Sequence, residues 1–150
     1  MNIAIIPARK GSKRIKNKNF KIFFNKPMIY WTINKLKKSN LFKLIIISSN
    51  SKKILQYAKK NGCDILIKRP ENLSDDKTST IETIKHAIKK LKFNTKKNIR
   101  IFCVYPCNPL LQLTDLKQSI NKLKKNSNKF IFPVAISQSH KNNLIFLNKS

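Results

Sequence analysis

Short apolar runs separated by longer amphipathic stretches make up most of the chain. Each run spans only three to five residues, which is too short for a membrane span and typical of a strand buried on both faces of a sheet. A further short strand is predicted at 144–147, after a loop. The main predicted strands are 3–6, 44–47, 65–67, 101–104 and 130–134.

The amphipathic stretches predict helices, because their apolar residues recur three and four positions apart. Pro27 fits the first turn of one helix, and Gly62 is a natural stop for a second helix within 50–61. The residues of the first helix that we expect to face inward are Ile29, Ile33 and Leu36.

Two later helices begin with side-chain caps. Ser79 and Glu82 have the spacing of a capping box, and Thr114 is expected to cap the next helix. The apolar stripes expected to face the sheet are Ile81, Ile84, Ile88 and Leu91 on the third helix and Leu116, Ile120 and Leu123 on the fourth.

The alternation of strands with helices predicts an α/β protein. Right-handed crossovers between such strands give a mostly parallel sheet with helices on both faces. We therefore expect a Rossmann-like, three-layer α/β/α fold in which residues 1–150 form a single domain.

The charge of the chain is extreme, with 33 basic residues, 6 acidic residues and a formal net charge of +27. Such a charge ordinarily indicates nucleic acid or an anionic membrane as a partner. Here the lysines are spread over every segment, and two of the four arginines, Arg9 and Arg14, lie in one loop. A nucleic-acid binder concentrates cations and aromatics on one stripe, so we expect neither nucleic acid nor a membrane as partner.

The cysteines and histidines offer no catalytic or metal arrangement. Cys63, Cys103 and Cys107 are odd in number, and together with the absence of a leader sequence they predict a reducing cytoplasm. No second Cys/His pair completes a metal site at Cys103 and Cys107. His86 and His140 have no acidic or thiol partner at a useful spacing.

The loop after the first apolar run concentrates groups that bind phosphate. The run ends at Pro7, after which Gly11 permits unusual backbone angles while Arg9, Lys13 and Lys18 supply positive charge. Ligands of open α/β sheets bind at such carboxyl strand ends. The loop therefore predicts a nucleotide site, with a merely basic surface loop as the alternative, since the spacing matches neither a Walker loop nor a dinucleotide fingerprint.

The same loop carries a family resemblance. Ala8-Arg9-x-Gly11-Ser12-Lys13-Arg14, Lys18-Asn19 and Asn25-Lys26-Pro27-Met28-Ile29 resemble the opening of the acylneuraminate cytidylyltransferases, which make CMP-activated nonulosonic acids from CTP. Within that family, the runs 12–15, 69–76 and 105–109 look more like the pseudaminic acid branch than the sialic acid branch.

The resemblance implies a nucleotide-diphospho-sugar transferase fold and transfer of CMP from CTP to a nonulosonic acid, with release of pyrophosphate. Arg9, Lys13 and Lys18 would stabilise the leaving phosphates together with Mg²⁺. The alternatives are a CMP-sialic acid or CMP-Kdo synthetase and, from another class, a non-catalytic nucleotide- or RNA-binding protein. The residues implied in nucleotide binding are Ala8, Arg9, Gly11, Ser12, Lys13, Asn19, Arg69, Asp76, Thr78 and Thr80.

Two later segments complete the implied site. Segment 69–80 is implied to recognise cytosine, because backbone groups and a cation such as Arg69 can pair with the edge of that base. The alternative is a plain helix cap preceded by solvated turn residues. Tyr105 and Asn108 are implied to contact the nine-carbon sugar acid, with a purely structural turn as the alternative. The sialic acid branch has Gln in place of Tyr105, so the identity of the sugar stays open.

Acidic residues are few, and we expect none of them at the end of the first or fourth predicted strand, where the triphosphate should lie. In the family, the metal-binding aspartates and much of the sugar pocket and dimer contact come from a C-terminal portion. The resemblance therefore implies that this chain is the N-terminal nucleotide-binding portion, with metal ligands beyond Ser150, of an enzyme that forms a homodimer. The acids present are Asp64, Glu71, Asp75, Asp76, Glu82 and Asp115.

Overall fold

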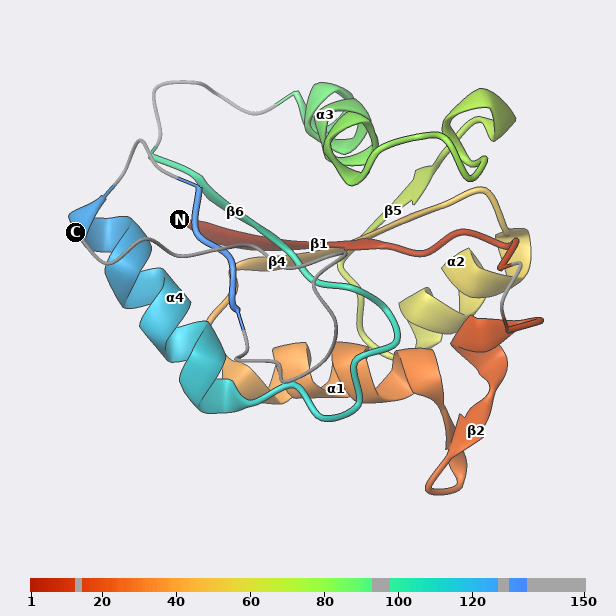
Figure 1. The fold of residues 1–150 in the computed structure, drawn as a ribbon, viewed down its shortest axis with the longest axis horizontal. Coiled ribbons are helices and arrows are strands. Elements are labelled where there is room, and N and C mark those ends of the chain that lie inside the picture. Colours follow the sequence, from red (N-terminus) through yellow and green to blue (C-terminus); the bar gives the residue numbers. More distant parts are fainter. Residues whose placement is uncertain (13–14, 93–97, 127–129, 135–150) are drawn as a thin grey trace, which may run out of the picture.

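A parallel sheet with helices on both faces forms the centre of the computed structural model, which describes residues 1–12, 15–92, 98–126 and 130–134. Helix α3 covers one face of the sheet, and α1, α2 and α4 lie on the other (Figure 1). The strands follow the order β5-β4-β1-β6. Their bounds are β1 Asn2–Pro7, β4 Leu44–Ser49, β5 Ile65–Lys68 and β6 Arg100–Cys103.

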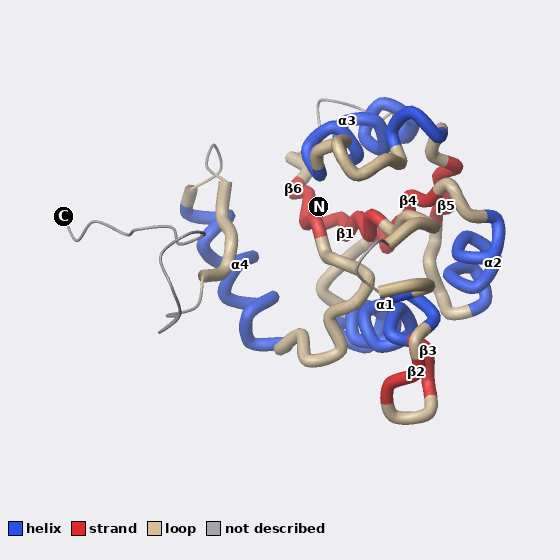
Figure 2. Tube along the Cα trace, turned by 45° about the vertical axis from the view of Figure 1, so that its right-hand side comes forward, coloured by secondary structure: helices blue, strands red, loops and turns tan. Residues whose placement is uncertain are grey.

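The helices follow the strands as the amphipathic pattern predicts. Their bounds are α1 Met28–Ser39, α2 Lys52–Lys60, α3 Thr80–Leu91 and α4 Leu113–Lys125. Two short 3-10 helices, η1 Lys18–Phe20 and η2 Glu71–Leu73, lie in the loops that follow β1 and β5. A small antiparallel pair, β2 Ile22–Phe23 and β3 Lys26–Pro27, projects from the body below α1 (Figure 2).

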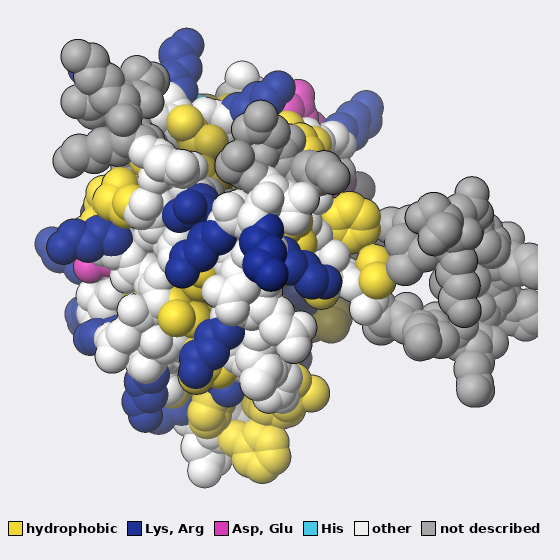
Figure 3. All heavy atoms as spheres, turned by 90° about the vertical axis from the view of Figure 1, so that its left-hand side faces the viewer, with side chains coloured by type: hydrophobic (Ala, Val, Ile, Leu, Met, Phe, Trp, Pro, Cys, Tyr) yellow, Lys and Arg dark blue, Asp and Glu magenta, His cyan; other side chains and the backbone are white. Residues whose placement is uncertain are grey.

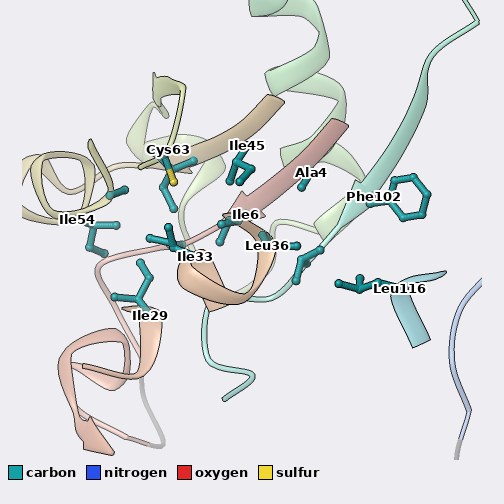
Figure 4. Close-up of a cluster of buried hydrophobic side chains, with 14 of the residues drawn as sticks. Ala4, Ile6, Ile29, Ile33, Leu36, Ile45, Ile54, Cys63, Phe102 and Leu116 are labelled. Atoms are coloured by element: carbon teal, nitrogen blue, oxygen red, sulfur yellow. The ribbon is translucent and has the colours of Figure 1, made fainter. Parts of the chain in front are cut away.

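Strand β1 lies at the centre of the fold because it is apolar on both faces. Ala4 and Ile6 pack toward α1, α2 and α4, whereas Ile3 and Ile5 pack toward α3, and all four are fully buried. Figure 4 shows the larger of the two cores, in which residues of α1, α2, β4 and β6 surround Ile6. Burial on both faces fixes the register of β1 between β4 and β6.

The predicted layers and the four N-terminal strands are therefore confirmed, whereas the strand predicted at 130–134 is wrong. Residues 130–134 have no strand structure, and the Phe130 side chain is 95% exposed. An apolar run becomes a strand only where a neighbouring strand can pair with it. The strand predicted at 144–147 lies outside the described residues.

Helix α3 faces the sheet with a stripe different from the predicted one. Thr83 and Ala87 are its buried residues, and the predicted stripe residues Ile81 and Ile88 are exposed. The small side chains of Thr83 and Ala87 allow α3 to lie close to β1 and β5, which rotates Ile81 and Ile88 outward. Only the other half of the predicted stripe, Ile84 and Leu91, packs against the sheet.

The predicted helix starts are correct for α3 and wrong for α4. Ser79 and Glu82 form the expected capping box. The N-cap of α4 is Gln112, so Thr114 lies inside the first turn and makes no capping bond. Pro27 precedes α1 at the N-cap position instead of lying in its first turn.

No helix in the described part of the chain is both long and apolar enough to cross a membrane.

Candidate functional site

A cleft of about 320 Å³ opens at the carboxyl edge of the sheet, between the loops that follow β1, β5 and β6. The chain continues from β1 to β4 and β5 on one side of β1, and then to β6 on the other side. Strand β1 therefore borders a topological switch point, where ligands of open α/β sheets bind. Residues from all three loops line the cleft: Pro7, Arg9, Gly11, Ser12, Lys18, Asn19, Arg69, Leu73, Asp75, Asp76, Thr78, Thr80, Thr83, Tyr105, Pro106 and Cys107.

Buried Asn19 holds the first loop in place. Its side-chain amide donates to the Arg9 carbonyl at 2.9 Å, and its side-chain oxygen accepts from the Cys107 thiol at 3.3 Å. The Lys10 amide donates to the side chain of Asn50 at 2.9 Å. These bonds tie the backbone of the first loop to the loops after β4 and β6, so the cleft has a defined cationic wall.

Gly11 does not need its conformational freedom in this structure. It is not among the residues with positive φ, and a Cβ atom built on it would meet nothing within 4 Å. The sequence argument that Gly11 serves unusual backbone angles is therefore wrong. The empty space beside the Gly11 backbone is instead compatible with close approach of a ligand.

An ion pair between Arg9 and Asp76 crosses the cleft. It joins the loop after β1 to the loop after β5, and both side chains remain about one-third exposed. The sequence places no acid at the end of the first strand, but folding brings the carboxylate of Asp76 there. The expectation that no acid lies near that strand end is thus corrected.

Arg69 lies at the floor of the cleft, where it is 4% exposed. Its Nη1 donates to Thr83 Oγ1 at 3.0 Å, and its backbone amide extends the sheet by donating to the Ser49 carbonyl at 2.9 Å. Its Nε and Nη2 are buried without any partner. Burial, followed by the positive charge of Arg9, lowers the pKa of Arg69, while Glu71 acts in the opposite direction.

Two unpaired donors on a buried cation are costly unless an acceptor satisfies them. An arginine keeps its charge at any physiological pH, so its unpaired donors must be satisfied by an acceptor on a ligand and not by loss of a proton. Arg69 therefore contributes to the lining of the cleft and carries a buried pair of donors, Nε and Nη2, that lacks an acceptor and suits a group with two adjacent acceptors.

The loop between η2 and α3 is shaped by local side-chain bonds. The hydroxyl and the amide of Thr78 donate to Asp75 Oδ1 at 2.5 and 2.7 Å. The bond from the Thr78 hydroxyl has the largest effect in lowering the pKa of Asp75, and the bond from the Thr78 amide lowers it further. Together with the capping box at Ser79, they explain how a polar segment keeps one conformation at the rim of the cleft.

Fully buried Thr32 of α1 positions the turn that follows β6. Its hydroxyl donates toward the Pro106 carbonyl at 3.1 Å and accepts from the Asn108 amide at 3.3 Å. The Tyr105 hydroxyl lies 2.9 Å from Thr80 Oγ1, which links this turn to the start of α3. The turn is thus held from both sides of the cleft.

Most of the residues predicted for the site meet in this cleft. Arg9, Gly11, Ser12, Lys18 and Asn19 approach from the first loop, and Arg69, Asp76, Thr78, Thr80 and Tyr105 from the others. Two of the predicted residues do not join them, and a third is outside the part of the chain that the structure describes. Ala8 is fully buried in the core, Asn108 does not line the cleft, and Lys13 lies outside the described residues.

Sequence reasoning assigned no site role to several residues that line the cleft. Thr83 looks like an ordinary helix residue, because only the fold brings it to Arg69. Thr78 is a predicted nucleotide-binding residue, but Asp75 is not, and the bond between them could have been found from the Asp-x-x-Thr spacing of a side-chain turn. The further lining residues without a predicted role are Pro7, Leu73, Pro106 and Cys107.

The described residues offer no metal cluster, and on one face of the molecule (Figure 3) the cations are spread out. Among the described residues no group of three or more His, Cys, Asp or Glu is placed to hold a metal ion. Burial raises the pKa of Cys103 to about 11 and also raises that of Cys107, so both remain protonated thiols at neutral pH. On the face in Figure 3, Lys and Arg side chains are dispersed among polar and apolar ones.

A parallel α/β sheet of this order, with a cationic cleft and a buried, partly unpaired arginine at its carboxyl edge, is typical of the nucleotide-binding class of α/β proteins. The chain belongs to the cytidylyltransferase family, which matches residues 3–146. This match confirms the predicted family.

Curated relatives agree with this family. The chain is 38% identical over 131 residues to the pseudaminic acid cytidylyltransferase of Campylobacter jejuni, covering 87% of this chain and 56% of that protein. It is 34% identical over 140 residues to the N-acylneuraminate cytidylyltransferase of Escherichia coli, covering 93% of this chain and 32% of that protein. The chain thus spans about half the length, or less, of the curated relatives described here.

Solved structures confirm the fold. A CMP:2-keto-3-deoxy-manno-octonic acid synthetase complexed with CTP superposes with a TM-score of 0.69 at 16% identity, covering 85% of this chain and 48% of that chain. A 4-diphosphocytidyl-2C-methyl-D-erythritol synthase superposes with a TM-score of 0.66 at 14% identity, covering 95% of this chain and 65% of that chain. The Rossmann-like nucleotidyltransferase fold predicted from the sequence is therefore correct.

Proposed function

We propose that the cleft binds CTP and that the protein transfers CMP to a nonulosonic acid, with pseudaminic acid as the first candidate, releasing pyrophosphate. The names of the most similar relatives support this substrate class. Among the structural observations, the one that carries the proposal is the buried Arg69 with its Nε and Nη2 donors unpaired at the cleft.

Arg69 would select the base. Nε–H and Nη2–H point the same way from one edge of the planar guanidinium and match two adjacent acceptors. Cytosine presents such a pair in its O2 and N3 atoms, whereas uracil carries a hydrogen on N3 and would place a donor against a donor. An unmade bond to a buried charged group is costly, so the site should prefer CTP over UTP.

Arg9 and Lys18, with Lys13 from outside the described residues, would bind the triphosphate. In the proposed reaction the anomeric hydroxyl oxygen of the sugar acid bonds to the α-phosphorus, the bond from that phosphorus to the pyrophosphate oxygen breaks, and the hydroxyl proton passes to water. Negative charge grows on the leaving pyrophosphate, where the cations of the first loop stabilise it.

Mg²⁺ belongs to the same proposal as the counter-ion of the triphosphate. It takes hard oxygen ligands, often one or two carboxylates with substrate phosphates. Asp75 and Asp76 line the cleft, but Asp75 accepts from Thr78 and Asp76 pairs with Arg9. The metal ligands expected beyond Ser150 remain part of the proposal, and Asp76, which pairs with Arg9 at the cleft, would be an additional oxygen ligand beside the phosphates.

The sugar acid would lie against the turn after β6. Tyr105 lines the cleft and supports this part of the proposal. Asn108 does not line the cleft, so it would have to contact the sugar acid outside it. The homodimer and the cytoplasmic location implied by the sequence remain part of the proposal, as does the single nucleotidyltransferase domain.

Calorimetric titration with CTP, UTP and a short RNA, each with Mg²⁺, tests the proposal. We expect CTP to bind at least roughly tenfold more tightly than UTP. Equal affinities for CTP and UTP would refute the proposed role of Arg69. Tighter binding of the RNA than of CTP would favour the alternative of a basic RNA-binding protein.

A further inference from the structure

The Arg69–Thr83 contact joins two buried side chains of the cleft that come from different elements. Arg69 is the first residue after β5, and Thr83 is in the first turns of α3. Their side chains are linked by the 3.0 Å bond from Nη1 to Oγ1, and the two residues are 4% and 3% exposed. The contact is therefore shielded from water, where a hydrogen bond to a charged group contributes most.

This single bond decides which edge of the guanidinium remains available. The five N–H donors of arginine lie in one plane in a fixed arrangement. With Nη1 bonded to Thr83, the edge formed by Nε and Nη2 is the one left without partners. A rotation of the guanidinium would exchange these roles and remove the parallel donor pair from its position.

Both ends of the contact are held by rigid structure. The Arg69 backbone amide bonds to the Ser49 carbonyl, so the residue continues the sheet. Helix α3 starts at the Ser79–Glu82 capping box, four residues before Thr83 in the chain. A hydroxyl held in this way can orient its partner to within a fraction of an ångström, as recognition of a base edge requires.

Packing alone does not call for a threonine at position 83. The same face of α3 uses Ala87, and threonine is a weaker helix former than alanine. A buried hydroxyl also needs a partner of its own. The Thr83 hydroxyl is therefore best explained by the arginine that it contacts.

We propose that Thr83 is a positioning residue for nucleobase selection, because its hydroxyl fixes the Arg69 guanidinium with the Nε–Nη2 edge toward the base. This inference rests on the proposed function, in which Arg69 pairs with cytosine. Thr83 also lines the cleft, but the proposed role acts through its bond to Arg69.

The test measures the ratio of the CTP and UTP affinities of the 150-residue chain by calorimetry. Thr83→Val keeps the shape of the side chain but removes the acceptor, and should lower the preference for CTP by about tenfold. Thr83→Ser restores a hydroxyl and should retain most of the preference. Thr83→Ala gives the same measurement if the valine variant fails to fold.

Ser48→Ala is the matched control. It removes the hydroxyl of a fully buried residue of β4 that does not line the cleft. It should leave the ratio of the two affinities unchanged.

An unchanged ratio in folded Thr83→Val or Thr83→Ala would overturn the inference, as would loss of the preference in Thr83→Ser. The proposed function fails separately, if the unsubstituted chain does not prefer CTP.

Discussion

Two arginines line the same cleft in opposite states. Arg9 is about one-third exposed and already paired with a carboxylate, whereas Arg69 is buried and keeps two donors without partners. A phosphate can replace the carboxylate beside Arg9 by simple exchange of anions. A base must instead match the fixed donors of Arg69. In the proposed function, Arg9 would thus belong to an adaptable phosphate end and Arg69 to a rigid base end of one site.

The largest effect should come from Arg69→Ala. Loss of two bonds to a buried charged donor should weaken CTP binding by roughly a hundredfold and bring the CTP and UTP affinities close together. Calorimetry with both nucleotides measures this, and a thermal melt checks the fold.

Arg100→Ala is the matched control for Arg69. Arg100 also has a buried Nε without a partner, but it begins β6 and so lies at the opposite, amino edge of the sheet. It should leave CTP binding unchanged. Similar losses in both variants would mean that buried arginines act here only through stability or bulk charge.

Arg9→Ala should have the next largest effect, weakening CTP binding about tenfold through the loss of one charge-assisted phosphate contact. Lys37→Ala removes the same charge from the last turn of α1 and should change the affinity less than about twofold. If titrations of the two variants gave equal losses, the cations of the first loop would contribute no more than the net charge of the chain.

Gly11→Ala separates an effect on the ligand from an effect on the fold. Its Cβ would contact nothing in the protein, so the melting temperature should stay constant while CTP affinity falls about fivefold, if a phosphate approaches the backbone there. Gly62→Ala should do the reverse, because Gly62 has a φ of +99° and its Cβ would lie 2.7 Å from Lys37 Cδ. That variant should lose about 1 kcal/mol of stability and keep its CTP affinity. An unchanged affinity in Gly11→Ala would place the phosphates away from this loop backbone.

Asp76→Asn should have the smallest effect, and one of opposite sign. With EDTA present, it frees Arg9 from a partly exposed ion pair worth about 0.2–1 kcal/mol, so CTP should bind up to about fivefold more tightly. The gain should shrink at high salt, which a titration series in NaCl would show. Weaker binding in EDTA would mean that the carboxylate orients Arg9 for the nucleotide instead of competing with it.

Sequence patterns predicted the elements that are buried on both faces better than those with one exposed face. Strand β1 is apolar at every central position, so it admits only an interior location. Helix α3 offers apolar residues on two sides, and its rotation depends on which of them fits the sheet. The run 130–134 has strand-like composition but pairs with no strand in the described part of the chain, a condition that composition cannot reveal.

By itself, the sequence determined the layer order, the family and the loops that meet at the site, because buried strands bring their carboxyl ends to one edge of a sheet. Only the tertiary structure decided how the site residues are paired. It brings Asp76 into contact with Arg9, and Thr83 into contact with Arg69. The two residues of each pair lie too far apart in the chain for a local sequence pattern to predict the contact. The physical reason is that a side chain's partner depends on the rotation and position of whole elements, which follow from packing of the complete core.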